Sequence, residues 1–287
     1  VYKGQEILGT AYYHLSYKAD QTASTPTYSY TCFDGYAAIA TKNNTIIYEN
    51  NVQKAVLQEG QVYYSYSAAA GEFTGRYITS NHPIAYYVIN TGTRIPDRNT
   101  AATECLYQLL GPLNGWGTTF LVPLTERGKE RIRIMASPNG TKITIPQSSG
   151  YSVKGSSGGA SLSNINAGNY VELEITDRNT GLYFSANNPV QVCAYMMGAT
   201  AFPGEGILGD QGDPSMVLIP PIEQSVPSST ISRFFIYNSQ TPITHHALII
   251  TRTDTRDQTT MAIGTGNDQP LSGGTWSTNA ASGYSFY

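Results

Sequence analysis

The sequence has little charge, and it lacks long apolar runs. Charged residues make up 13% of its 287 residues, against roughly 25% in typical soluble domains. The 17 basic and 20 acidic residues leave a formal net charge of −3, so no basic stripe is available for phosphates and we expect no nucleic-acid binding. No run approaches the roughly 18 apolar residues that cross a membrane. We therefore expect no membrane span in this segment.

Cysteine and histidine are scarce, which limits the chemistry open to the chain. The cysteines are Cys32, Cys105 and Cys193. They form no zinc-binding spacing, and one disulfide with a remaining thiol fits their number without saying which two pair. The histidines are His14, His82, His245 and His246. The adjacent pair projects to opposite sides of a strand, and no Gly-x-Ser-x-Gly nucleophile turn is present. The sequence therefore predicts a protein that is not an enzyme and has no cofactor.

Aspartates in loops are the remaining candidates for a metal site, because calcium prefers oxygen ligands. The loop aspartates considered are Asp210, Asp213, Asp254, Asp257 and Asp268. None has EF-hand spacing, so we interpret them as solvated turn residues, with a calcium site as the weaker alternative. Asp213 precedes Pro214 and is expected to form a turn.

Against this sparse background, one block of sequence occurs twice. Residues 75–88 return as residues 181–194 with Gly, Tyr, Asn and Pro at the same spacing, and residues 40–47 and 8–13 match 136–143 and 116–121 in the same order. A period of roughly 100 residues suits a small domain with its own core. We expect Pro83 and Pro189 to open matching strands, and residues 43–44 and 139–140 to form matching hairpin tips.

Short β-branched and aromatic runs bounded by Gly, Pro, Asn and Ser indicate strands throughout. The predicted fold is all-β, with tandem antiparallel β-sandwich modules related by an internal repeat. The modules are expected at residues 1–112 and 113–205, with a partial third module at 206–287 whose first strand is near residues 216–219. Its last strand ends at Phe286 and Tyr287, and we expect its uncovered edge to be met by a continuation of the chain or a neighbouring subunit.

Trp116 and Gly117 follow Pro112 at the predicted joint between the first two modules. A tryptophan in a loop at such a joint gains most from burial. We therefore expect a structural role for both residues, with Trp116 buried between the modules.

Tyrosine is abundant, with 22 residues, several of them in adjacent pairs on predicted strands. One member of each pair faces outward, where tyrosine provides contact area for glycans or proteins; Tyr12, Tyr64 and Tyr87 are the candidates. The alternative is that tyrosine merely favours sheets. Asn43 and Asn139 begin glycosylation sequons in form, although turn chemistry alone produces the same residues.

Three segments resemble a known family. They are Ser80-Asn-His-Pro-Ile-Ala85, Glu104-Cys-Leu-Tyr-Gln-Leu-Leu-Gly-Pro-Leu-Asn-Gly-Trp-Gly117 and Gly212-Asp-Pro-Ser-Met-Val-Leu-Ile-Pro-Pro-Ile-Glu-Gln224. Over roughly residues 9–287 the chain is similar to the N-terminal domain of IgGFc-binding proteins, and the Gly-Asp-Pro-x-Met segment is the most specific part. The resemblance implies a secreted or surface-attached, non-enzymatic protein found in mucus or on bacterial surfaces.

The favoured function is an extracellular adhesion or ligand-binding protein whose partners are proteins or glycans at a surface or in mucus. The alternative is a structural subunit of an extracellular filament or matrix, assembled through β-strand edges and hence through self-association. A hydrolase is the third hypothesis, with the least support in the sequence.

Overall fold

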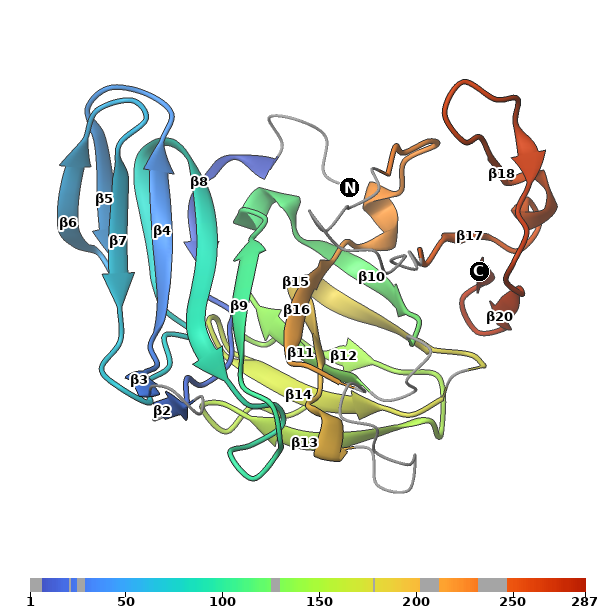
Figure 1. Ribbon diagram of the computed structural model, residues 1–287, viewed down its shortest axis with the longest axis horizontal. Helices are drawn as coiled ribbons and strands as arrows, with labels where there is room; N and C mark the ends of the chain where they lie inside the picture. The colour runs from blue at the N-terminus through green and yellow to red at the C-terminus, as the bar shows by residue number, and fades with distance from the viewer. Residues whose placement is uncertain are drawn as a thin grey trace.

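The computed structural model describes residues 7–20, 22–24, 29–124, 130–177, 179–201, 212–231 and 247–287. Within these ranges the chain forms antiparallel sheets with a few short 3-10 turns, which confirms the predicted all-β class. Two seven-stranded sheets lie side by side, and a small C-terminal sheet lies beyond the second (Figure 1). No helix among the described residues is long and apolar enough to cross a membrane.

The first large sheet contains seven strands from the N-terminal part of the chain. They are β1 (Gly9–Tyr13), β4 (Asp34–Ala40), β5 (Thr45–Glu49), β6 (Val52–Leu57), β7 (Val62–Tyr66), β8 (Tyr77–Thr93) and β9 (Glu104–Leu109). The long strand β8 pairs first with β1 and β5 and then with β4 and β9. Strand β8 is therefore shared by two groups of strands that pack over one core. One group contains β1 and β5, and the other contains β4 and β9.

The second large sheet is arranged around another long strand, β15. Its strands are β10 (Gly117–Val122), β11 (Glu130–Ala136), β12 (Ile143–Thr144), β13 (Tyr151–Ser156), β14 (Tyr170–Ile175), β15 (Leu182–Met196) and β16 (Ser215–Ile219). Strand β15 pairs with β10 and β12 in its first half and with β11 and β16 in its second half.

The smaller elements connect and follow the two large sheets. The minor strands are β2 (Thr22–Ser24), β3 (Ser29–Thr31), β17 (Ile250–Arg252), β18 (Thr260–Met261), β19 (Gln269–Pro270), β20 (Ser277–Asn279) and β21 (Tyr284–Phe286). The 3-10 turns are η2 (Leu113–Gly115), η3 (Ala199–Ala201), η4 (Ile222–Gln224) and η5 (Arg256–Gln258).

The two large sheets share strand pairings and registers. Tyr12 pairs with Ile78 in the first sheet as Phe120 pairs with Phe184 in the second. The register of β1 on β8 shifts once, and that of β10 on β15 shifts at the matching place. The sheets differ in one respect: β6 extends the first sheet beside β5, whereas β13 extends the second beside β14.

Two sequence-based expectations about local structure need correction. Pro83 and Pro189 do not open strands; both lie inside β8 and β15, where the strands change partners, because a residue without an N–H is tolerated where the hydrogen-bond ladder is interrupted. Residues 43–44 and 139–140 form turns rather than hairpin tips. The strands on either side of each turn do not pair with each other: β4 and β5 both pair with β8, while β11 and β12 both pair with β15.

The segment at residues 216–219 was expected to open a third module. It forms β16 instead, which pairs with β15 in the second sheet. Its counterpart is β9, since each strand leads to a proline and a 3-10 turn, Pro112 before η2 and Pro221 before η4. The expected open edge at Phe286 is also wrong, because β21 lies between β17 and β20 and the phenylalanine is buried.

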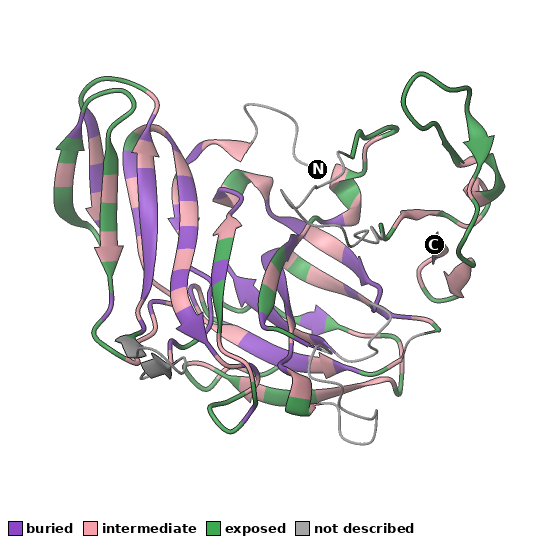
Figure 2. Cartoon of the chain, in the orientation of Figure 1, coloured by how far each residue is buried: buried purple, intermediate pink, exposed green. Residues whose placement is uncertain are grey.

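Two hydrophobic clusters hold the sheets. One lies inside the second sheet and includes Phe120, Phe184 and Ile132. The other fills the first sheet around Tyr36 and continues onto the outer side of the second through Met135, Cys193, Tyr195 and Leu218. Figure 2 shows this burial along β4, β8 and β15. Alternate side chains of β11 therefore pack into two different hydrophobic clusters.

Two glycines at matching positions permit close packing against the prolines that precede the 3-10 turns. A Cβ added at Gly9 would lie 2.3 Å from the Cβ of Pro112, and one added at Gly117 would lie 2.3 Å from the Cβ of Pro221. Gly9→Ala and Gly117→Ala should each lower the free energy of unfolding by about 1–3 kcal/mol through overpacking, as measured by urea denaturation. Gly155→Ala is the control, because no atom lies within 4 Å of an added Cβ there. Equal stability of all three variants would contradict the packing account.

Candidate interaction surface

The outward side of the first sheet carries a continuous uncharged surface. Along β7, side chains alternate so that Tyr63 packs on the core while Val62, Tyr64 and Tyr66 point outward. The register of β4 on β7 and β8 places Ala37 between Tyr64 and Tyr87. In the same way, Gly35 pairs with Tyr66 and Ile89, and Ile89 pairs with Tyr107 of β9. We call this surface the tyrosine face, defined by Val62, Tyr64, Tyr66, Ala37, Tyr87 and Tyr107.

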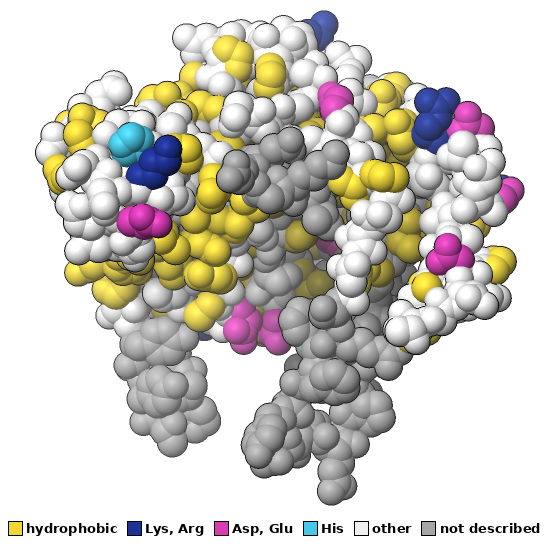
Figure 3. Space-filling view, turned by 90° about the horizontal axis from the view of Figure 1, so that it is seen from above, with side chains coloured by type: hydrophobic (Ala, Val, Ile, Leu, Met, Phe, Trp, Pro, Cys, Tyr) yellow, Lys and Arg dark blue, Asp and Glu magenta, His cyan; other side chains and the backbone are white. Residues whose placement is uncertain are grey.

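The tyrosines of this face are exposed but mutually supported. The exposed fraction is 43% for Tyr64, 58% for Tyr66 and 63% for Tyr107. The rings of Tyr64 and Tyr66 stack with centroids 5.6 Å apart, and those of Tyr87 and Tyr107 stack at 5.1 Å. Figure 3, seen from above, shows hydrophobic side chains gathered on the left-hand part of the molecule, beside basic, acidic and histidine side chains. A contiguous exposed apolar patch of this kind marks an interaction site.

Small residues separate the stacked pairs. Ala37 is 9% exposed and Gly35 is buried, so β4 forms a low floor between the tyrosines of β7 and those of β8 and β9. Charged side chains are absent from the face as defined. The surface is therefore built for contacts by packing and tyrosine hydroxyls rather than by ion pairing.

Tyr12 was predicted to belong to an outward surface, and this is wrong. Its side chain is fully buried, its hydroxyl donates to the carbonyl oxygen of Ile84 at 2.7 Å, and the hydroxyl accepts from the amide of Gly9 at 2.7 Å. Its ring stacks on Tyr86 at 5.0 Å, and burial raises the pKa of Tyr12. Tyr12 faces the core because it pairs with Ile78, another core residue.

The corresponding side of the second sheet is covered by the first sheet. Arg133 of β11 donates to the Ser16 carbonyl oxygen at 2.6 Å, to Glu72 at 2.5 Å and to Glu172 at 2.9 Å. Its guanidinium lies 4.0 Å from the centre of the Tyr17 ring. Burial alone would lower the pKa of Arg133, but the neighbouring carboxylates, Glu72 foremost, raise it well above its usual value. The joint thus contains a buried, charged arginine that pairs with Glu172 and with the partly exposed Glu72.

Trp116 contributes to the same joint. It is 8% exposed, its Nε1 donates to the carbonyl oxygen of Gly111 at 3.3 Å, and its ring centre lies 6.2 Å from that of Tyr13. Strands β9 and β16 adjoin nearby, where the amide of Leu218 donates to Oε1 of Gln108 at 3.3 Å (Figure 1).

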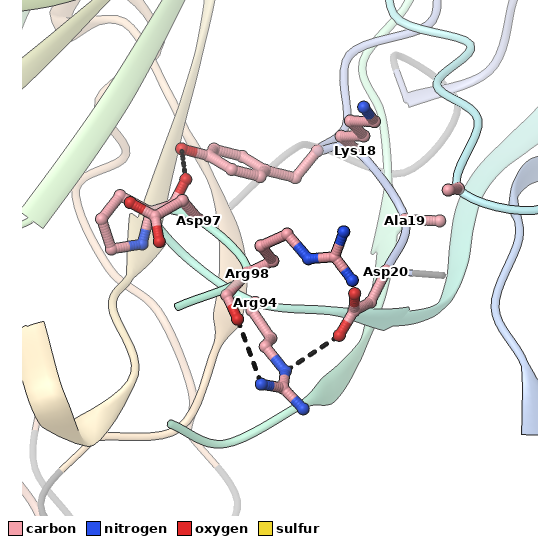
Figure 4. A pocket seen from close by; sticks show the side chains of 9 residues that line it. Lys18, Ala19, Asp20, Arg94, Asp97 and Arg98 are labelled. Atoms are coloured by element: carbon pink, nitrogen blue, oxygen red, sulfur yellow. Dashed lines mark hydrogen bonds and ion pairs between the residues drawn. The ribbon is translucent and has the colours of Figure 1, made fainter. Parts of the chain in front are cut away.

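A cavity of about 280 Å³ lies at the side of the joint and is lined by both cations and carboxylates (Figure 4). Arg94 is paired with Asp20 at 2.9 Å and donates to the Arg98 carbonyl oxygen at 3.1 Å. Lys18, Asp97 and Arg98 complete the charged lining. The lining contains no serine, cysteine or histidine, so it offers no such nucleophile beside a histidine base.

His14 belongs to a buried hydrogen-bond network that was not predicted from the sequence. The ring nitrogens of His14 lie 2.8 Å from the Tyr86 hydroxyl and 3.2 Å from Oδ1 of Asp34. All three side chains are fully buried, so a substrate has no route to them and their role is to satisfy one another's hydrogen bonds. His82 is partly exposed on β8, while His245 and His246 lie outside the described residues.

The aspartates considered for calcium are not brought together. Asp254 pairs with Arg252 at 3.1 Å, Asp257 pairs with Arg256 at 3.5 Å, and Asp213 is exposed just before buried Pro214 and β16. Asp210 lies outside the described residues. Over the ranges that the structure describes, there is no group of three or more His, Cys, Asp or Glu side chains able to hold a metal ion.

The two sequon asparagines are exposed and support turns. Oδ1 of Asn43 accepts from the amide of Glu59 at 3.0 Å, and Oδ1 of Asn139 accepts from the amide of Ala167 at 3.0 Å. Their glycosylation stays a prediction. Cys105 and Cys193 are free thiols, the first exposed and the second buried with a raised pKa because of burial.

The fold and its surfaces define an all-β protein of several antiparallel sheets with an uncharged aromatic face. The chain belongs to the IgGFc-binding protein family, whose sequence model matches residues 1–287. This confirms the family resemblance drawn from the sequence. Searches of curated proteins and of solved structures each gave no significant match.

Proposed function

We propose that this chain is a non-enzymatic extracellular protein that acts in adhesion or ligand binding, with the tyrosine face as its protein-binding surface. The observation that carries the proposal is the exposure of Tyr64, Tyr66 and Tyr107 on a sheet surface without charge. Tyrosines held by stacking lose little rotamer freedom on binding, and aromatic residues are enriched in the centres of protein interfaces. Family membership supports a protein partner.

The domain organisation is part of this proposal. Two matched units run from β1 to η2 and from β10 to η4, followed by a C-terminal unit containing β17 to β21. The shared registers of the two large sheets support these limits. With these unit limits, the domain boundaries expected at residues 112 and 205 move to the ends of η2 and η4.

A second candidate function is a structural subunit of a filament or matrix. It is favoured by β6, an edge strand of the first sheet, in which Val52 and Val56 are 58% and 53% exposed. An exposed apolar edge strand can accept a strand from another chain. Lys54 in the middle of β6 opposes such pairing, because a lysine on an edge is a common protection against strand addition.

The tyrosine face is tested by placing a charge on it. The Fc fragment of immunoglobulin G is the protein probe suggested by the family, and immobilised mucin glycans are the carbohydrate probe. Tyr66→Lys and Tyr107→Lys should each weaken Fc binding at least tenfold in biolayer interferometry, because a charge buried without a partner in an interface is strongly unfavourable.

Val56→Lys is the matched control, since it adds the same charge to another exposed strand of the same sheet. Retained Fc binding in both tyrosine variants, with loss in Val56→Lys, would contradict the proposal and indicate the β6 edge as the Fc-binding surface. Glycan binding that is lost in the tyrosine variants, without any Fc binding, would replace the protein partner by a carbohydrate.

A further inference from the structure

The tyrosine face occupies a position that the second sheet already uses for docking. In the second sheet, Arg133 and Glu172 stand at the pairing that Ala37 and Tyr64 occupy in the first. Likewise, Cys193 pairs with Arg133 as Tyr87 pairs with Ala37. The two faces are therefore register-equivalent sides of two sheets whose matched strands pair in the same way, with β6 and β13 as the exceptions.

In the second sheet this side is buried. Arg133 bonds to the Ser16 carbonyl oxygen and to Glu72, both in the first unit, and the Tyr195 hydroxyl also donates to the Ser16 carbonyl oxygen at 3.1 Å. Cys193 shares a hydrophobic cluster with the first sheet. This side of the second sheet is therefore covered by other parts of the protein, whereas the equivalent side of the first sheet is exposed.

We propose that the tyrosine face is covered by the tyrosine face of a second copy of this chain, in a closed two-fold dimer. The inference rests on the proposed function of this face as a protein-binding surface. Two uncharged sheet faces can pack on each other without desolvating charge. A two-fold arrangement needs no surface beyond the one already exposed.

Contacts within the chain disfavour a head-to-tail alternative. The part of the first unit that receives the second sheet, around Ser16 and Glu72, is occupied within each copy. The matching loop before β15 is occupied too, because Nδ2 of Asn279 in the C-terminal unit donates to the Thr180 carbonyl oxygen at 2.9 Å. A second copy therefore offers neither of these surfaces, while its tyrosine face remains exposed.

The size of the face sets the expected strength. Four strands about 4.8 Å apart, each contributing about five residues of about 3.3 Å, give a footprint of roughly 19 by 17 Å. This is about 320 Å² per copy and roughly 650 Å² in total, which is below the roughly 1,200 Å² of standard specific interfaces and corresponds to a weak, transient contact. We expect a dissociation constant on the order of 100 µM and a dimer that forms reversibly.

Sedimentation equilibrium of the whole 287-residue chain from about 1 to about 200 µM tests the proposal. The expected result is a monomer–dimer equilibrium with no larger species, unchanged between low and about 1 M salt because the face is uncharged. Tyr107→Lys and Ala37→Asp should each weaken dimerisation at least tenfold, while Val56→Lys should leave it unchanged. Thermal unfolding verifies that each variant is folded, and Tyr66→Ser serves as a milder variant if Ala37→Asp unfolds.

A monomer at every concentration, a dimer that the face variants leave intact, or a series of growing oligomers would overturn the proposal. Fc binding separates this inference from the proposed function. If Fc binds the monomer through the face but no dimer forms, only the inference fails. If the dimer forms and Fc does not bind, the inference stands and the external ligand is wrong. If both form, Fc should dissociate the dimer by competing for the same tyrosines.

Discussion

Arg133→Ala is expected to lower the free energy of unfolding by about 3–5 kcal/mol. Removing the guanidinium leaves Glu72 without its cation and leaves Glu172 with Arg131, at 2.8 Å, as its remaining partner. Breaking a buried ion pair is far more costly than forming it is favourable. The substitution also removes the stacking of the guanidinium on Tyr17 and Tyr170. Guanidinium chloride denaturation followed by circular dichroism measures the change.

Arg252→Ala is the control for this prediction. Arg252 also pairs with a carboxylate, Asp254, but the side chains are 67% and 63% exposed, so water screens the pair and the denaturation midpoint should not move measurably. Equal midpoints for Arg133→Ala and the unsubstituted protein would show that the joint does not depend on the arginine. A double variant, Arg133→Met with Glu172→Leu, should recover part of the loss, because it removes the buried carboxylate as well and leaves only the 25% exposed Glu72 without its cation.

Trp116→Ala is expected to lower the free energy of unfolding by about 3–5 kcal/mol, because it leaves a large cavity between the two big sheets. The indole is 8% exposed and belongs to the cluster that joins Tyr13 and Leu113 of the first unit to Met216 and Leu218 of the second sheet. Small-angle X-ray scattering should also report a change in the arrangement of the two sheets. Chemical denaturation provides the stability difference.

Trp276→Ala is the comparison for Trp116, since the chain has two tryptophans and this one packs on Tyr287 in the C-terminal unit with ring centres 5.2 Å apart. It is only partly buried, so its removal should cost less and leave the scattering profile of the large sheets unchanged. If Trp116→Ala altered neither stability nor scattering, the role of Trp116 in rigidifying the joint would be excluded.

The sequence predicted strands well because alternation and turn residues act locally. It predicted less about how strands combine, because pairing depends on distant residues. Residues 216–219 have the apolar pattern of a strand wherever they pair, so the pattern alone does not identify their partner, and the prediction placed them in a third module rather than beside β15. Only the proline and 3-10 turn that follow the strand distinguish it as the counterpart of β9.

The same limit applies to the candidate surface. Adjacent tyrosines show that one side chain faces outward, but alternation alone does not fix which one, and Tyr12 was assigned to the wrong side. Tyr66 and Tyr107 were not predicted, although both side chains face outward in the alternation of their strands. Tyr66 lies two residues after Tyr64 on β7, and Tyr107 pairs with Ile89. The role of Arg133 could not be predicted, because a charged residue inside a strand usually marks the solvent side, and only the packing of the two sheets shows it to be buried.

Hydroxyl-radical footprinting with mass spectrometry tests most directly whether the tyrosine face is the binding surface. The oxidation rates of Tyr66 and Tyr107 are compared between dilute protein and protein bound to its partner, either Fc or a second copy. The account predicts that both rates fall severalfold on binding, while those of Val56 and Ile263, which are exposed on other elements, stay the same. Undiminished oxidation of Tyr66 and Tyr107 in the bound protein, with protection elsewhere, would contradict it.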